Sequence, residues 1–185
     1  MLRGFFYVSH NGFCPRHLSR YALLGEMNVH EIIDRFVSSV VSPEANFRRV
    51  ENALWIDDLE AKLPKRFPAS FRSLITRYSF AAFDCGELSF FANLGDGSDE
   101  DLSVAVFRDR FLSDATLQAG FIQFARPVGG SYDPICFDAN RSRSNQEFPI
   151  VRLDHEAILC RDKIRVIEEV ADSFLKFALE KTKRA

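Results

Sequence analysis

The side chains best suited to acid–base chemistry lie in two short stretches, "VGGSYDPICFD" at 128–138 and "IVRLDHE" at 150–156. Asp133, Asp154 and Glu156 could work as paired carboxylates, and His155 could carry a proton to or from a substrate. Two carboxylates could also cleave a glycosidic bond, although the sequence does not give the separation that decides this mechanism. A small hydrolase that uses these four residues is therefore one candidate function.

The same residues also fit a purely structural role. If "IVRLDHE" is a strand, Asp154 and Glu156 point to one face and His155 to the other, so the three side chains do not converge on one ion. The chain has four histidines, and none belongs to an H-E-x-x-H or H-x-x-x-H pattern. We therefore expect no metal site, no cofactor and no catalytic residue.

Patterns for phosphate binding and for a nucleophile are weak. Gly129 and Gly130 lack the lysine of a P-loop and the G-x-S-x-G arrangement of a nucleophile elbow, so they indicate a tight turn with positive φ. Cys85, Cys136 or Cys160 could pair with His155, since catalytic partners need not be close in sequence. Cys136, however, lies in the apolar stretch "PICF", which is typical of an inert buried thiol.

Two groups of acidic residues are candidate contacts for a cationic partner. One belongs to a predicted helix near residue 60, and the other to the loop "GDGSDED". Together they comprise Asp57, Asp58, Glu60, Asp96, Asp99, Glu100 and Asp101. Such clusters are usually solvated surface, but they can also receive a partner of opposite charge.

The composition predicts one ordinary folded domain. The chain has 185 residues, 46% of them hydrophobic and 27% charged, with a formal net charge of -2 that lacks the basic excess of nucleic-acid binders. With 19 phenylalanines and one tryptophan, the core should be built on phenyl rings. Four cysteines without a C-x-x-C pair suggest reduced thiols in a cytosol. No apolar run approaches the roughly 20 residues of a membrane span, so we expect a cytoplasmic protein without membrane contact.

Hydrophobic spacing predicts the elements that position these residues. Residues 1–26 show no periodicity and are interpreted as an irregular extension, either mobile or the product of an upstream start, before a single domain at 27–185. Helices are expected over 28–41, where Asn28 is the N-cap, from about 43 or 46 to 62, and over 67–78. In the second helix Phe47, Val50, Leu54 and Leu59 should be buried, while Asp57, Asp58 and Glu60 should face outward.

The second half of the chain predicts strands and a closing helix. Strands are expected within 87–94, 120–128, 132–138 and 148–153, the last three as a meander, whereas 102–107 fits a strand or a helix. Apolar residues from Ile164 to Ala178 fall at helical spacing and predict a C-terminal helix. The fold class is thus α+β, with a mostly antiparallel central sheet packed by N-terminal helices and a C-terminal helix.

In this order, over roughly 46–180, the chain resembles the SUKH superfamily, specifically its Smi/Knr type. The segments that carry the resemblance are "VENALWIDDLEAKLPKRFPASFRSLITRYS", "LSFF", "VGGSYDPICFD", "IVRLDHE" and a C-terminal amphipathic helix. The matching positions are Glu60, Leu63, Pro64, Phe71, Leu74, Ile75, Gly129, Gly130, Asp133, Ile135, Phe137, Asp154, His155 and Glu156. The Asn-Gly pair that often follows the second helix of the family is replaced here by "RYSFAAFDCG".

The resemblance implies an α+β fold without a catalytic apparatus. Many bacterial members look like immunity proteins that bind and block a toxin, frequently a nuclease, and fungal members resemble regulatory scaffolds of cell-wall signalling. We therefore expect a protein-binding domain, an immunity protein whose partner is a toxin, with a regulatory scaffold as the alternative and the oligomeric state left open. The acidic residues above would face the basic substrate cleft of a nuclease, and the motif residues would be structural.

Overall fold

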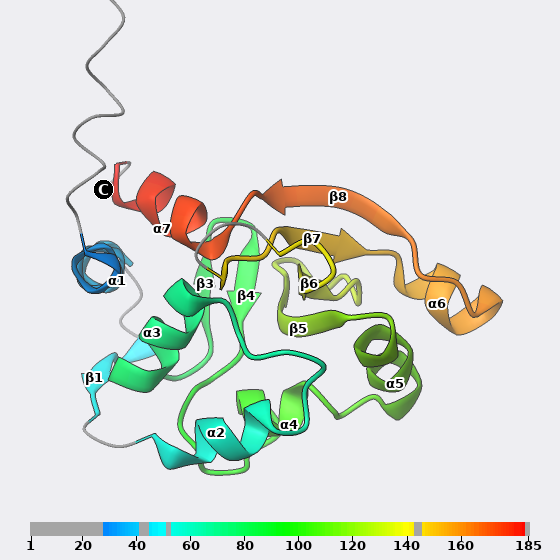
Figure 1. The fold of residues 1–185 in the computed structure, drawn as a ribbon, viewed down its shortest axis with the longest axis horizontal. Coiled ribbons are helices and arrows are strands. Elements are labelled where there is room, and N and C mark those ends of the chain that lie inside the picture. Colours follow the sequence, from blue (N-terminus) through cyan, green and yellow to red (C-terminus); the bar gives the residue numbers. More distant parts are fainter. Residues whose placement is uncertain (1–27, 41–44, 51–52, 143–145, 184–185) are drawn as a thin grey trace, which may run out of the picture.

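The computed structural model describes residues 28–40, 45–50, 53–142 and 146–183. Within these ranges the chain forms seven helices, a six-stranded antiparallel sheet and a two-stranded sheet, so the predicted α+β class is confirmed (Figure 1). The extension predicted at 1–26 lies outside the described residues.

The six strands of the main sheet follow one another in space as they do in sequence. The elements are α1 Val29–Ser39, β1 Arg48–Arg49, α2 Leu54–Glu60, α3 Ala69–Arg77, β2 Tyr78–Ser79, β3 Phe83–Cys85, β4 Leu88–Phe90, α4 Leu102–Ala105, α5 Arg110–Gln118, β5 Phe121–Pro127, β6 Ile135–Asp138, β7 Ile150–Leu153, α6 His155–Arg161, β8 Val166–Ala171 and α7 Phe174–Thr182. The sheet order β3-β4-β5-β6-β7-β8 is an antiparallel meander, and β1 pairs with β2 in a separate ribbon.

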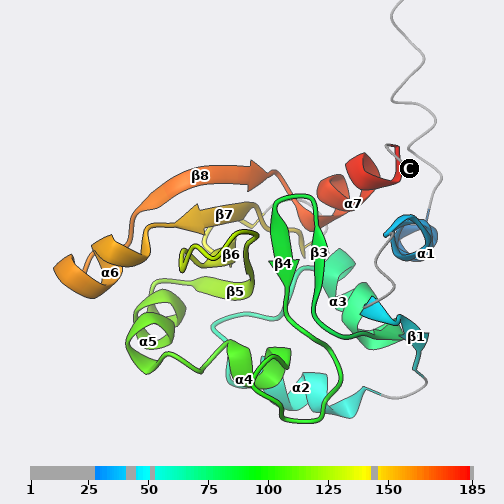
Figure 2. The same cartoon turned by 180° about the vertical axis from the view of Figure 1, so that it is seen from behind.

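Helices pack on both faces of this sheet. α1, α3 and α7 lie together on the side of the molecule where β3 and β4 are, and α5 and α6 lie together on the other side, as Figures 1 and 2 show. Side chains alternate between the two faces, because Ile150 belongs to the larger hydrophobic cluster and its neighbour Val151 to the smaller one. The smaller cluster also holds Leu112 of α5 and Ile158 of α6, so these two helices cover the opposite face.

Phenyl rings dominate the larger cluster, as the composition predicts. Phe71 of α3 lies 5.0–5.3 Å, between ring centroids, from Phe67, Phe124, Phe137 and Phe174. Phe124 and Phe137 stack on neighbouring strands with centroids 4.0 Å apart. The rings therefore join α3 and α7 to the middle of the sheet.

Several elements predicted from local sequence signals are confirmed. Asn28 caps α1 by accepting the His30 N–H at 3.1 Å. The predicted meander is confirmed as β5, β6 and β7, and the turn before β6 holds Gly129 and Gly130 at φ +94° and +87°. The ambiguous stretch 102–107 begins as the helix α4, capped by Asp101.

The second predicted helix is wrong in its first half. Arg48–Arg49 forms β1, and α2 is confined to Leu54–Glu60. Phe47 packs against the rings of Phe80 and Phe83 from an extended segment, so its burial does not need a helix. Leu54, expected in the core, is 69% exposed.

The predicted C-terminal helix is wrong over its first half as well. Val166–Ala171 forms β8, the last strand of the sheet, and α7 begins only after Ser173 caps it by accepting the Lys176 N–H at 3.1 Å. The β-branched residues of "RVIEEV" suit a strand, and hydrogen bonding to β7 decides between the two periods.

Candidate functional site

Glu60 does not face solvent as the sequence suggests; it is buried and holds the connection between α2 and α3. One carboxylate oxygen accepts the Phe67 N–H at 3.0 Å and the other the Arg72 Nε–H at 3.1 Å. Leu63, the next motif position, is also buried, whereas Pro64 is exposed. Glu60 and Leu63 therefore belong to the packed interior, and Glu60 is not available to a partner.

Glu60→Ala is expected to lower the free energy of unfolding by about 2 kcal/mol, because a buried N–H and a guanidinium lose their acceptor. The matched control is Asp58→Ala in the same helix, whose exposed carboxylate makes no hydrogen bond within the described part of the chain. Urea unfolding of both variants checks this. Equal stabilities for the two variants would contradict the structural role of Glu60.

Asp101 is likewise withdrawn from the surface, so the prediction that it contacts a partner is wrong. Its side chain is fully buried and accepts the N–H groups of Leu94 and Gly95 at 3.0 and 2.7 Å and that of Ser103 at 3.0 Å. One carboxylate thus caps α4 and fixes the start of the acidic loop. Its role is to position the neighbouring acids.

The two segments that carry the remaining acids pack against each other. A Cβ atom placed on Gly95 would lie 3.0 Å from the Trp55 Nε1, so the loop packs directly on α2. Asp58 of α2 and Gly95 and Ser103 line the same small cavity. We define the acidic surface as the exposed side chains of Asp57, Asp58, Asp96, Asp99 and Glu100. Of these, Asp57 is paired with Arg72 at 2.6 Å.

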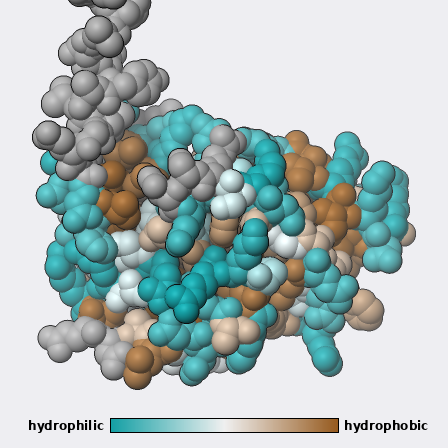
Figure 3. Space-filling model, viewed as in Figure 1, coloured by the Kyte–Doolittle hydropathy of each residue, from teal (hydrophilic) through white to brown (hydrophobic). Residues whose placement is uncertain are grey.

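Exposed apolar side chains accompany these acids. Leu54, which starts α2, is 69% exposed, and Leu94, which precedes Gly95, is 46% exposed. Figure 3 shows hydrophobic and hydrophilic surface interleaved along the lower edge of the molecule, where α2 lies. Apolar side chains surrounded by charge are suited to contact another protein.

The "DHE" residues end a strand instead of continuing it. β7 stops at Leu153, and the Asp154 carboxylate caps α6 by accepting the Ala157 N–H at 3.0 Å. His155 and Glu156 therefore occupy the first turn of a helix. The strand alternation expected for these three residues is wrong because Asp is a strong N-cap residue.

Asp133 is the centre of a buried polar cluster. Its Oδ1 accepts the Nδ1–H of His155 at 2.6 Å and its Oδ2 accepts the Arg152 Nη2–H at 2.6 Å and the Ser131 hydroxyl at 3.0 Å. Burial by itself would raise the pKa of the Asp133 carboxyl, but hydrogen bonds from His155, Arg152 and Ser131 outweigh it and hold this pKa far below its usual range. The carboxylate joins the turn before β6 to β7 and α6.

The structure thus joins two of the four residues of the hydrolase hypothesis. Asp133 binds His155, whereas the Asp154 carboxylate is committed to its helix and Glu156 is exposed. Cys136 is fully buried, and burial, followed by the charge of Asp138, raises the pKa of its thiol. Among the described residues no cysteine is hydrogen-bonded to His155, and no group of three or more His, Cys, Asp or Glu side chains is arranged to hold a metal ion.

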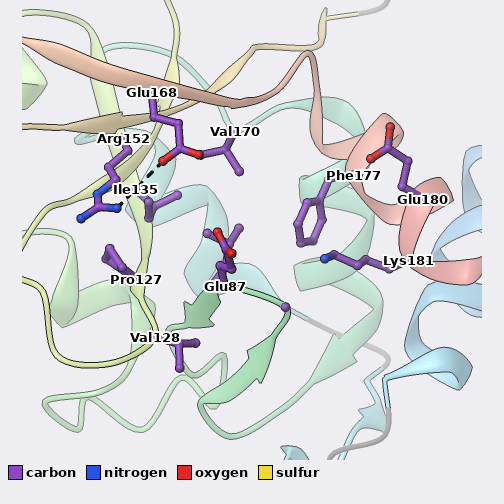
Figure 4. A pocket seen from close by; sticks show the side chains of 12 residues that line it. Glu87, Pro127, Val128, Ile135, Arg152, Glu168, Val170, Phe177, Glu180 and Lys181 are labelled. Carbon is purple, nitrogen blue, oxygen red and sulfur yellow. Dashed lines mark ion pairs between the residues drawn. The ribbon is translucent and has the colours of Figure 1, made fainter. Parts of the chain in front are cut away.

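A groove of about 690 Å³ lies between the β3–β4 turn, the β7–β8 edge and α7 (Figure 4). Glu87 points into it, Arg152 and Glu168 face each other across 3.9 Å, and Lys181 Nζ lies over the ring of Phe177. Arg152 is already paired with Asp133, and the other charged side chains of the groove are mostly paired or solvated. Their arrangement does not indicate a particular class of ligand.

A smaller cavity contains a residue that sequence reasoning missed. Arg126, near the end of β5, lines it together with Tyr132 and His155. A single arginine in the strand "GFIQFARPV" carries no motif, so only the fold brings it beside His155.

Comparison with known proteins does not assign the chain to a family. A scan against models of protein families finds no match. A search of curated proteins also finds no significant relative. Membership of the SUKH superfamily therefore stays a prediction from the order of its motifs. Within the described residues, no helix is both long and apolar enough to cross a bilayer.

Proposed function

We propose that this chain is a non-enzymatic protein-binding domain that acts as an immunity protein and neutralises a toxin, with the acidic surface as its contact. The observation that carries the proposal is the meeting of two acidic segments, α2 and the loop after β4, which are separate in sequence. A nuclease, whose substrate cleft is basic, is the kind of toxin that this surface would block.

Charge complementarity gives such a surface a physical advantage. Opposite potentials steer two proteins together and raise the association rate, which matters when a toxin must be bound before it acts. The exposed side chains of Leu54 and Leu94 supply apolar contacts beside the charges. Affinity would then come from a few apolar anchors, and speed and specificity from the acids.

The surface is also pre-organised. Asp101 fixes the backbone at Leu94 and Gly95, and Trp55 packs against Gly95. A loop held in this way loses little conformational entropy on binding, which favours tight association.

The first experiment is a pull-down of the tagged protein from its native cells, followed by mass spectrometry and size-exclusion chromatography of what co-elutes. The expected result is one equimolar partner with toxic activity, nuclease activity in particular. An equimolar partner without toxic activity would favour the regulatory scaffold, and the absence of any stoichiometric partner would overturn the proposal.

The contact surface is tested with the triple variant Asp58→Lys, Asp99→Lys and Glu100→Lys. We expect its association with the captured toxin to be about tenfold slower at low salt, with the difference shrinking as salt is added. The control is Asp84→Lys, Asp114→Lys and Glu180→Lys, which changes the net charge equally at exposed positions elsewhere. Stopped-flow or surface plasmon resonance measures the rates. If both triple variants associate alike, the acidic surface is not the contact.

A further inference from the structure

A cavity of about 250 Å³ lies between the sheet and the helices α4, α5 and α6. Its polar lining consists of Asp109, Ser113, Gln123, Arg126, Tyr132 and His155. None of these residues belongs to the acidic surface, so whatever this cavity does is separate from the binding of a toxin. Two of them, Arg126 and His155, present groups that are suited to hold an anion.

Arg126 is a half-buried cation that forms no ion pair with a described residue. Among the described residues no carboxylate lies within ion-pair distance of its guanidinium, which sits 5.6 Å from the centre of the Phe91 ring. Burial, and then the nearby charge of Arg108, lowers the pKa of Arg126 and outweighs the opposite effects of Tyr132 and Asp109, but an arginine side chain remains protonated in proteins. The free protein therefore carries the desolvation cost of a cation that a bound anion would offset.

The one acid in the cavity does not fill this role. The Asp109 carboxylate accepts the Leu112 N–H at 3.2 Å as the N-cap of α5. Ser113 and Gln123 are neutral, and their side chains donate to the backbone carbonyls of Arg110 and Ala125. The cavity lining thus holds one guanidinium, that of Arg126, and one carboxylate, that of Asp109, which form no ion pair with each other.

His155 lines the same cavity, and only one of its ring nitrogens is used by the fold. The Asp133 carboxylate only accepts hydrogen bonds, so the Nδ1 that faces it at 2.6 Å must carry the proton. Nε2 has no partner among the described residues. The hydrogen bond to Asp133 holds the His155 ring in one orientation. The ring of Tyr132 lies beside it, with the two ring centroids 6.0 Å apart.

From these contacts we propose that the cavity binds a phosphoryl group, with Arg126 donating to its oxygens and His155 Nε2 as the second contact. Guanidinium and phosphate pair with matching geometry. A phosphoryl group offers both acceptor oxygens and a P–OH, so it can accept from a protonated Nε2 or donate to a neutral one. A carboxylate can only accept. The cavity is small by the standard of ligand sites, roughly 300–1,000 Å³, so it takes inorganic phosphate or a small phosphate monoester and excludes larger ligands.

The test is titration of the full chain with inorganic phosphate, methyl phosphate and acetate at constant ionic strength, followed by two-dimensional NMR. We expect saturable shifts that centre on Arg126, Tyr132 and His155, with either phosphate binding more tightly than acetate. Tighter binding of methyl phosphate identifies an ester as the ligand, and tighter binding of inorganic phosphate identifies the free ion.

Two substitutions separate the contacts. Arg126→Gln removes the cation, and His155→Asn keeps a donor toward Asp133 while it removes Nε2; each should weaken phosphate binding about tenfold. Arg35→Gln on α1, an exposed arginine remote from the cavity, is the matched control and should bind like the wild type. Thermal melts show whether each variant is folded, and Arg126→Met, which also removes the cation, replaces Arg126→Gln if the latter is not.

Three results would overturn the proposal. The first is the absence of saturable shifts in the wild type at about 10 mM phosphate. The second is unchanged phosphate binding in folded Arg126 and His155 variants. The third is acetate binding as tight as phosphate binding, which would assign the cavity to carboxylates.

Discussion

Replacing Phe71 by alanine is expected to lower the free energy of unfolding by about 4 kcal/mol. The ring is 2% exposed and lies within 5.3 Å, centroid to centroid, of four other phenyl rings. These rings come from the segment before α3, from β5, from β6 and from α7, so the cavity left behind would lie where helices meet the sheet. Close-packed surroundings of this kind relax only in part, and the lost contacts add to the lost burial.

Guanidinium chloride unfolding measures this effect, with a lower midpoint and an unchanged slope as the signature. Phe111→Ala is the matched control, because that ring is 84% exposed on α5 and its removal should change the stability by less than about 0.5 kcal/mol. Similar losses for both variants would show that Phe71 is not a centre of the core.

Replacing Asp133 by alanine is the second large expected effect, a loss of about 3 kcal/mol at neutral pH. Asp133 is 7% exposed, and its carboxylate is the shared acceptor for His155, Arg152 and Ser131. Without it, a partly buried guanidinium loses its counter-charge and a partly buried imidazole N–H loses its acceptor. The turn before β6, strand β7 and α6 would lose the group that joins them.

The pH dependence of stability gives an independent measure of the same cluster. The pKa of Asp133 in the folded chain lies below its unfolded value of about 3.9. The stability that it contributes is therefore fully present above the unfolded pKa and is lost as the pH falls toward the folded pKa. Urea unfolding between about pH 6 and pH 2 should show a shallower acid loss in Asp133→Asn than in the wild type.

The control for the acid series is Asp84→Asn, an exposed carboxylate on β3. Its acid loss should follow the wild type. An Asp133→Asn profile parallel to the wild type would mean that the carboxylate is not held by these hydrogen bonds in solution.

Elements with a strong local signal were predictable. α1 combines apolar residues at helical spacing with a capping asparagine, and β5, β6 and β7 are apolar runs separated by turn residues. Each signal rests on groups only a few residues apart, so it is present in the chain before any tertiary contact forms. The confirmed fold class follows from the order of these segments.

Elements whose pattern fits two periods were not predictable. "RVIEEVA" places apolar residues where either a helix or a strand would use them, and pairing with β7 makes it a strand. Arg48–Arg49 is extended because it pairs with β2, about thirty residues later. The conformation of such segments is decided by strands that are distant in sequence, and a local pattern carries no information about those strands.

The burial of acids has the same origin. Glu60 and Asp101 look like solvated charges, yet each is buried against backbone N–H groups. Glu147 is the clearest example of an acid buried by the fold. Both of its carboxylate oxygens accept hydrogen bonds from Ser70, far earlier in the chain, and burial raises the pKa of this carboxyl. Whether an acid is exposed depends on donors that the fold brings to it.

By itself, the sequence determined the α+β class, the first helix and its cap, the strand meander with its glycine turn, and the phenylalanine core. Only the tertiary structure decided that α2 and the loop after β4 share one acidic surface, that Asp133 binds His155, and that Arg126 stands unpaired beside them. The physical reason is the separation in sequence over which each interaction acts. Periodicity, capping and turn chemistry act within a few residues, whereas burial and charge pairing join segments that the sequence keeps far apart.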